Sequence, residues 1–163
     1  MTANSEPRAT VARLLRESRA HAGLARAVTD FPPELAGRQV DGFRHTAWQQ
    51  VEHLRLAAED LVRYCLDADY EELEFPAGYW PATAAPPTPA AFEASVHGLL
   101  AATERMAALV EDPARDLLAR APTADDASHH TLRAALILLD HNGYHAGQLV
   151  ALRTALGAWP PAG

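Results

Sequence analysis

The chain has 163 residues, one cysteine (Cys65) and a net charge of −7, from 21 acidic and 14 basic side chains. A single cysteine excludes a disulfide framework and a Cys-rich zinc module, and a 48% share of hydrophobic residues excludes a disordered chain. Neutralising phosphates supplies most of the affinity for nucleic acid, so this acidic chain is expected to form one domain over residues 1–163 with no nucleic-acid partner.

The composition favours helices, because alanine and leucine are abundant whereas β-branched and aromatic residues are sparse. No segment shows the alternating pattern of a strand. The first predicted helix covers about residues 8–28, where apolar residues recur at spacings of three and four. Ser5 is its predicted N-cap, Pro7 lies in its first turn, and Pro32 follows its end.

The second predicted helix covers about residues 45–67, with an apolar stripe on one face and charged residues on the other. Cys65 lies on the apolar stripe, and we expect it to be an inert core residue. The connection that follows, residues 68–87, contains several aromatic residues and prolines. Free linkers are polar and small, so we expect an ordered wrap over the helices.

The third predicted helix begins at Thr88 and Pro89, which are the expected N-cap and first helical position. Asp112 and the proline after it end this helix. Residues 115–120 are predicted to add one extra helical turn before the fourth helix.

The fourth predicted helix begins at His129 or His130 and ends at Leu156, and Gly157 is its predicted C-terminal stop. Four helices with a long central connection predict an all-α, four-helix bundle. A link of about 20 residues can travel the length of a bundle, so the second and third helices are expected to run parallel. The predicted order is up-down-down-up, with the long crossover between helices two and three.

Neither a membrane partner nor an export signal is indicated by the sequence. The longest apolar run, residues 134–139, is far shorter than the ~20 residues that span a bilayer. The N-terminus has no apolar stretch behind a basic start, so we expect a cytoplasmic protein. An exposed apolar face on the first helix is a candidate surface for a homodimer.

His141 and His145 lie four residues apart in the fourth predicted helix, so both side chains point the same way, one turn apart. Two imidazoles so placed can bind one divalent transition metal through neutral ring nitrogens. They also fall within the apolar stripe, where burying an unsatisfied polar group costs about 1–3 kcal/mol. Two interpretations remain open: metal ligands, or core histidines bonded to backbone or side-chain groups.

A third ligand must come from another helix, and His53 is the candidate. It lies on the flank of the second predicted helix, between the apolar stripe and the charged face. A flank position suits a catalytic metal at the rim of the bundle, with three protein ligands and one free position. A solvated surface histidine is the alternative.

Two segments resemble the DinB-like (DinB/YfiT) superfamily. They are TAWQQVEHLRLAAEDL at residues 46–61, and residues 131–160, where Asp-His-Asn-x-Tyr-His-x-Gly-Gln precedes Leu-Gly-x-Trp-Pro. Tyr-Trp-Pro at residues 79–81 is also similar to a family feature. The resemblance implies an up-down-down-up four-helix bundle with one divalent metal, nickel or zinc, held by three histidines. In this sequence these histidines are His53, His141 and His145.

The same resemblance implies a function. Characterised relatives include thiol-dependent S-transferases and isomerases that use bacillithiol or mycothiol. We therefore expect a metal-dependent enzyme that acts on a small molecule, with transfer of a low-molecular-weight thiol as the preferred reaction. Metal-dependent hydrolysis is one alternative. The other is a non-catalytic, stress-associated bundle that binds a metal or ligand, or merely dimerises.

Residues near the three histidines are candidates to contact bound water or substrate, or to accept a hydrogen bond from a ligand imidazole. They are Asp140, Tyr144, Gln148, Asp60 and Glu52. Gly143 and Gly147 lie inside the fourth predicted helix, at a cost of about 1 kcal/mol each relative to alanine. Close helix packing is the preferred explanation for these glycines, and access for a ligand near the metal is the other.

Overall fold

A computed structural model describes residues 5–18 and 20–161. Over these residues the chain is all-α, as predicted, and two residues joined by an isolated bridge are the only β-structure within them. The α-helices are α1 (Ser5–Arg16), α2 (Leu24–Val28), α3 (Ala47–Leu66), α4 (Pro89–Glu111) and α5 (Thr131–Ala155), and the short 3-10 helices are η1 (Pro33–Leu35) and η2 (Ala77–Tyr79).

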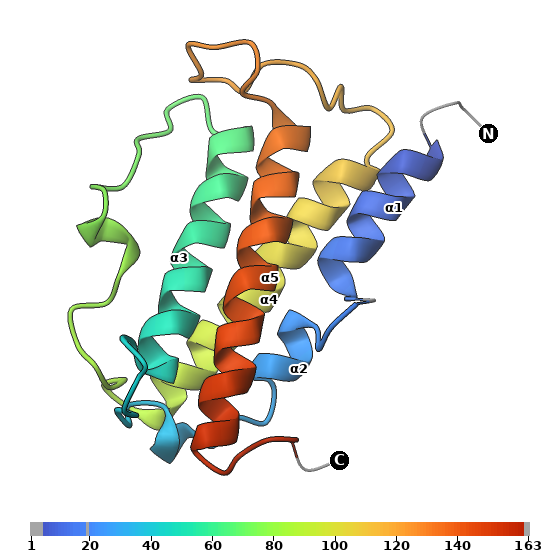
Figure 1. The fold of residues 1–163 in the computed structure, drawn as a ribbon. Helices are drawn as coiled ribbons and strands as arrows, with labels where there is room; N and C mark the ends of the chain where they lie inside the picture. Colours follow the sequence, from blue (N-terminus) through green and yellow to red (C-terminus); the bar gives the residue numbers. More distant parts are fainter. Residues whose placement is uncertain (1–4, 19, 162–163) are drawn as a thin grey trace.

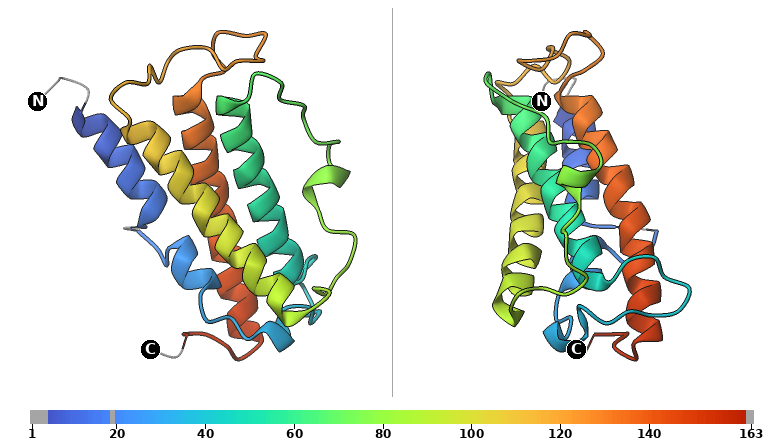
Figure 2. Two further views of the ribbon diagram at one scale, coloured as in Figure 1. Left: turned by 180° about the vertical axis from the view of Figure 1, so that it is seen from behind. Right: turned by 90° about the vertical axis from the view of Figure 1, so that its left-hand side faces the viewer.

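Three long helices make the body of the molecule, and the two N-terminal helices cover one side of it (Figure 1). α3 packs against α4 and α5, whereas α1 packs mainly against α4 and α2 against α5. In Figure 1, α3 and α4 run upward from their N-terminal ends, and α1 and α5 run downward. The connection between α3 and α4 descends along the outside of α3, which Figure 2 shows from two further sides.

The prediction of one continuous helix over residues 8–28 is wrong. α1 ends at Arg16, and α2 begins only after Gly23, which is extended at φ −68° and ψ 162°. Ser18 accepts a hydrogen bond from the backbone N–H of His21, and such local side-chain bonds compete with the helical ladder. The break lets α2 turn toward α5 while α1 stays against α4, which a single straight helix over these residues does not do.

Two other local predictions are also wrong. Ser5 is the first residue of α1 rather than its cap. The segment 115–120 contains turns but no helix. Asp116 accepts from the backbone N–H of Leu118 at 2.9 Å, which holds a turn.

The predicted starts of the second and third helices agree with the structure. Thr46 and Gln49 form a reciprocal capping box at the start of α3. Thr88 accepts from the backbone N–H of Ala91 at 3.1 Å, and Pro89 occupies the first position of α4. These caps satisfy backbone donors that have no partner within the helix.

The predicted end of the fourth helix is confirmed. Gly157 has φ +73°, a conformation that glycine adopts without steric cost. Its N–H bonds to the carbonyl of Thr154 at 3.0 Å, and the N–H of Ala158 bonds to the carbonyl of Arg153 at 2.9 Å. This pair of bonds is the Schellman arrangement, which closes the C-terminal turn of α5.

Residues 68–87 are an ordered wrap, as expected. The phenols of Tyr70 and Tyr79 both donate hydrogen bonds to Asp60 on α3, at 3.0 and 2.9 Å. Near the end of the wrap, the hydroxyl of Thr46 donates to the carbonyl of Ala84 at 2.6 Å. The wrap is therefore held at the N-terminus of α3 and at Asp60 in its C-terminal half, which fixes the position of its aromatic residues.

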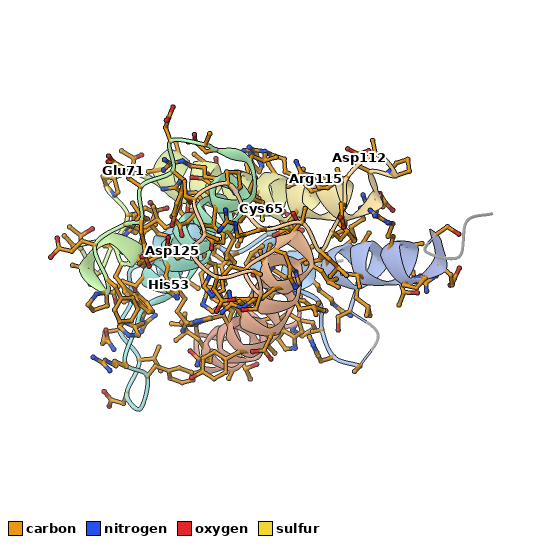
Figure 3. All side chains as sticks on the ribbon, turned by 90° about the horizontal axis from the view of Figure 1, so that it is seen from above. His53, Cys65, Glu71, Asp112, Arg115 and Asp125 are labelled. Atoms are coloured by element: carbon orange, nitrogen blue, oxygen red, sulfur yellow. The ribbon has the colours of Figure 1, made fainter. Side chains whose placement is uncertain are left out.

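The core lies between α3, α4 and α5, and its large side chains are fully buried. Its main apolar members are Phe92, Leu54, Leu99, Met106, Leu138, Leu149 and Leu152. Cys65 is 3% exposed and lies inside the bundle, which Figure 3 shows from above, so the expectation of a core cysteine is confirmed. Within the described residues, no helix combines the length and apolar character needed to cross a membrane.

Candidate metal centre

The structure brings together the three histidines singled out by the sequence. His53 projects from α3, and His141 and His145 project from successive turns of α5. One ring nitrogen of each lies within 4.8 Å of those of the other two, and the Nε2 atoms of His53 and His141 are 3.0 Å apart. Figure 3 shows His53 on the side of the bundle where α3 lies next to α5. The ring centroids are 4.7 to 5.0 Å apart, with the rings edge to face.

Two of the imidazoles are held by hydrogen bonds from the ring nitrogen that faces away from the cluster. His53 Nδ1 lies 2.8 Å from the carbonyl oxygen of Tyr79, and His145 Nδ1 lies 3.3 Å from Oε1 of Gln50. A carbonyl oxygen only accepts, so each Nδ1 carries the proton. Each neutral ring then presents the lone pair of its Nε2, which is the form that binds a metal.

The environment keeps the three rings neutral. Burial, together with the neighbouring imidazoles, lowers the pKa of His141 to about 4 and that of His145 to about 3. Burial also lowers the pKa of His53, against the bond to the Tyr79 carbonyl, which raises it. Desolvation disfavours the charged form of a histidine, so no proton has to be displaced from a cation at neutral pH.

These residues fit a divalent metal ion by their chemistry. With metal–nitrogen distances of about 2.0–2.1 Å, tetrahedral ligands lie about 3.3 Å apart, close to the 3.0 Å between His53 and His141. Because His53 Nδ1 donates to Tyr79, the contact at 3.0 Å is a bond from the Nε2–H of His141 to Nε2 of His53. A divalent cation would be held by all three Nε2 atoms once the proton of His141 lies on its Nδ1.

Trp80 forms one wall of the cluster. Its ring stacks on His53 with centroids 3.9 Å apart and planes within 2°, and on His45 with centroids 4.1 Å apart. From the sequence, Trp80 is noted only within the Tyr-Trp-Pro segment, and neither His45 nor Gln50 is singled out. The spacing of three between Gln50 and His53 places both on one face of α3, and this signal could have identified Gln50.

Three residues of α5 that the sequence offers as contacts for bound water, substrate or a ligand imidazole lie around the histidine cluster without a hydrogen bond to it. Asp140 is exposed and influences His141 only through its charge, which raises the pKa of that ring. Tyr144 is 65% exposed, with its ring edge-on to His145 at 5.0 Å. Gln148 is half-buried and has no hydrogen bond to the cluster among the described residues.

Glu52 turns away from the three histidines. It pairs with Arg55 at 2.6 Å and accepts from the hydroxyl of Ser95 on α4 at 2.6 Å. Burial raises the pKa of the Glu52 carboxyl, but the bonds to Arg55 and Ser95 and the charge of Arg55 together outweigh it and hold the pKa below its usual range. Glu52 therefore links α3 to α4 and does not contact the candidate metal ligands.

Asp60 reaches the cluster indirectly. It is 8% exposed and accepts from the phenol of Tyr79, whose backbone carbonyl accepts from His53. The carboxylate thus anchors the part of the wrap that orients one imidazole. This role needs the tertiary contact between α3 and residue 79.

Close helix packing does not account for the two glycines of α5. A methyl group added at Gly147 would meet nothing within 4 Å, and one at Gly143 would meet only Nε2 of His21, at 3.7 Å. Both positions have room for alanine, so the preferred sequence interpretation is not supported.

The chain matches a known protein family over most of its length. The family model described as DinB superfamily matches residues 11–149, a range that includes all three histidines. Neither a curated protein nor a solved structure gives a match.

Proposed function

Because the chain belongs to the DinB superfamily and gathers three neutral histidines at one point, we propose that it binds a divalent metal through His53, His141 and His145. We propose further that the loaded protein is an enzyme acting on a small molecule. The observation that carries the proposal is the convergence of three imidazole nitrogens within 4.8 Å. Zinc and nickel are the candidate metals, since both accept imidazole ligands.

A divalent metal held by three histidines lowers the pKa of a bound water or thiol and polarises carbonyl groups. The residues of the chain supply the frame for this chemistry. Tyr79 and Gln50 orient two of the rings, and Trp80 covers one face of His53. Tyr144, exposed beside His145, is placed to meet a molecule that approaches from solvent.

Transfer of a low-molecular-weight thiol is the preferred reaction, because a thiolate is the nucleophile in such transfers. This preference rests on the resemblance to thiol-dependent relatives. Hydrolysis of a small substrate uses the same metal and is the enzymatic alternative. The third candidate is a bundle that binds a metal and catalyses neither thiol transfer nor hydrolysis.

We also propose an order for the helices, a dimer surface and a cellular location, as the sequence leads us to expect. The parallel course of α3 and α4 supports the up-down-down-up bundle (Figure 1). Leu14 on α1, 36% exposed, supports the first helix as the surface of a homodimer. We place the protein in the cytoplasm, with a small-molecule substrate and without nucleic-acid or membrane partners.

The decisive test measures the metal content of the purified protein and of two variants. His141→Ala is expected to lose most of the bound metal, because two histidines remain where three converge. His97→Ala is the matched control, since His97 is exposed on α4 and lies outside the cluster. Full metal occupancy in His141→Ala would show that the ligand set is wrong.

The loaded protein is then assayed for thiol transfer and for hydrolysis, before and after treatment with a chelator. Activity that is lost on chelation and restored by added metal is expected for the enzyme. Metal at full occupancy without turnover over a panel of thiols and esters would favour a binding role instead.

A further inference from the structure

The indole of Trp80 lies between two imidazoles. It stacks on His53 with centroids 3.9 Å apart and planes within 2°, and on His45 with centroids 4.1 Å apart and planes at 21°. Two imidazoles stacked on one face of an indole would touch each other, and the described residues show no ring contact between His45 and His53. The two histidines therefore cover opposite faces of Trp80.

The indole restrains a motion of His53 that its hydrogen bond leaves free. The bond from Nδ1 to the carbonyl oxygen of Tyr79 is 2.8 Å long, and it fixes the direction in which Nδ1 points. The ring can still tilt about the line of that bond. A flat side chain packed on the face of the imidazole opposes the tilt, so residues 79 and 80 together fix both the direction and the plane of the ring.

The stack leaves the metal-binding nitrogen of His53 free. The lone pair of Nε2 lies in the plane of the imidazole, whereas Trp80 covers its face. The indole also lies at 63° to the ring of His145, with centroids 6.4 Å apart, so it borders two of the three histidines. Trp80 thus restrains one ligand from the side and leaves the point where the three nitrogens converge unobstructed.

Trp80 is itself held in place. Its backbone N–H donates to the carbonyl of Ala77 at 3.3 Å, at the end of η2. The residue before it, Tyr79, is anchored through its phenol to Asp60 at 2.9 Å. On the other face of the indole, His45 directly precedes the capping residue of α3. The indole is therefore fixed both through its backbone and from the face turned away from His53.

The imidazole on that far face is mostly neutral at pH 7. Burial and the charge of Arg44 lower the pKa of His45, against a hydrogen bond to Gln49, which raises it. A pKa below the ordinary value of about 6.5 leaves most of the ring uncharged at neutral pH. His45 therefore supports the indole without adding a positive charge near the proposed metal.

We infer that Trp80, backed by His45, is a positioning residue that holds the plane of His53 for metal binding. The inference rests on the proposed metal site, and it adds to that site a residue that does not touch the metal. An aromatic pair contributes the equivalent of up to about a tenfold change in a binding constant. A ligand that is already oriented keeps this gain as metal affinity, because less freedom is lost on binding.

The test measures the affinity of the full-length protein for nickel(II) by competition with a chromophoric chelator. Trp80→Leu is expected to weaken binding by about five- to tenfold, because leucine offers no flat face. Trp80→Phe keeps a flat face and is expected to stay within about twofold of the wild type. Trp159→Leu is the matched control, since this half-buried tryptophan packs on Arg26 and Arg153, and it should bind nickel like the wild type.

A double-mutant cycle separates the positioning of His53 from a general effect on the fold. In His53→Ala, the remaining pair His141 and His145 forms a weaker two-ligand site, and the imidazole that Trp80 holds is gone. Adding Trp80→Leu to this variant is expected to cause no further loss of nickel affinity. An equal loss with and without His53 would show that the indole supports the fold alone, and would overturn the inference.

Indole emission supplies a second readout. Nickel quenches the emission of a neighbouring indole, and among the described residues Trp80 is the tryptophan whose ring contacts the ligand histidines. Nickel is expected to lower the emission of the wild type and of Trp159→Leu, and Trp80→Phe should bind nickel without this response. Full quenching in Trp80→Phe would contradict the placement of the indole beside the metal.

The two proposals fail in different ways. A wild-type protein that binds no nickel would overturn both the metal site and the role of Trp80. A wild-type protein that binds nickel, with Trp80→Leu binding as tightly, would overturn the positioning role alone.

Discussion

His53 shows how both nitrogens of one imidazole can be assigned from their neighbours. Its Nδ1 donates to the Tyr79 carbonyl at 2.8 Å, and its Nε2 faces His141 at 3.0 Å. The same logic applies to His145, whose Nδ1 is 3.3 Å from the amide oxygen of Gln50. A fixed ring that presents a lone pair loses little freedom when a metal binds.

Gln50→Leu is predicted to weaken metal binding. Gln50 is 2% exposed and holds His145 in position, and loss of such a contact lowers metal affinity by about 10- to 100-fold. Competition with a chromophoric chelator measures the change. Gln148→Leu is the control, since Gln148 has no hydrogen bond to the cluster in the described structure. Equal affinities in the two variants would contradict this role of Gln50.

Cys65 is predicted to react slowly with thiol reagents. It is 3% exposed, and burial raises the pKa of its thiol, against Thr131 and Arg115, which lower it. A raised pKa leaves less of the reactive thiolate at pH 8. Reaction with a disulfide reagent should be slow in the native protein and fast in denaturant, and a fast native reaction would contradict the buried position.

At the scale of elements, the wrap of residues 68–87 decides the environment of the cluster. Its two tyrosines meet at Asp60, two turns along α3 from His53. The shared carboxylate makes the wrap a part of the site, because the same segment carries the Tyr79 carbonyl and Trp80. An element with little regular structure thus completes a site on two helices.

From the surroundings of Tyr70 in the wrap, we predict that the unfolding free energy falls at alkaline pH. Burial and the bond to Asp60 raise the pKa of Tyr70 above its ordinary value of about 10. When the pKa of a phenol is higher in the folded than in the unfolded protein, the phenol adds its full stabilisation at pH values below the pKa of the unfolded protein. That stabilisation is lost as the pH rises toward and through the pKa of the folded protein. The unfolding free energy should therefore fall as pH rises above about 10.

Tyr70→Phe is expected to show a smaller alkaline fall in the unfolding free energy, measured by urea denaturation across pH. Tyr144→Phe, which removes a phenol from a residue that is 65% exposed, should follow the wild type. Identical profiles for all three proteins would rule out the coupling of Tyr70 to Asp60.

At the scale of the whole molecule, one buried arginine joins segments far apart in the chain. Arg153 on α5 is fully buried and donates to the carbonyls of Ala27, Thr29, Asp30 and Ala158, at 2.7 to 3.1 Å. Burial lowers the pKa of its guanidinium, and the charge of Asp30 opposes that shift. It ties the loop after α2 to the C-terminal tail.

Arg153→Met is predicted to destabilise the protein by about 3 kcal/mol or more, because the carbonyls of Ala27, Thr29 and Asp30 lose the same buried donor group together. Arg38→Met removes an exposed arginine and should change the unfolding free energy by about 0.5 kcal/mol at most. Thermal or urea unfolding measures both. A change below about 1 kcal/mol in Arg153→Met would show that water replaces these bonds.

The sequence by itself determined the all-α class, the bounds of α3, α4 and α5 to within about two residues, and the pairing of His141 with His145 on one helix face. These features depend on caps and apolar spacing within a few residues of each other, so local patterns specify them. The tertiary structure alone decided the break after Arg16 and the approach of His53 to the other two histidines. It also decided which atoms orient the rings, because contacts between segments separated by tens of residues depend on how the helices pack.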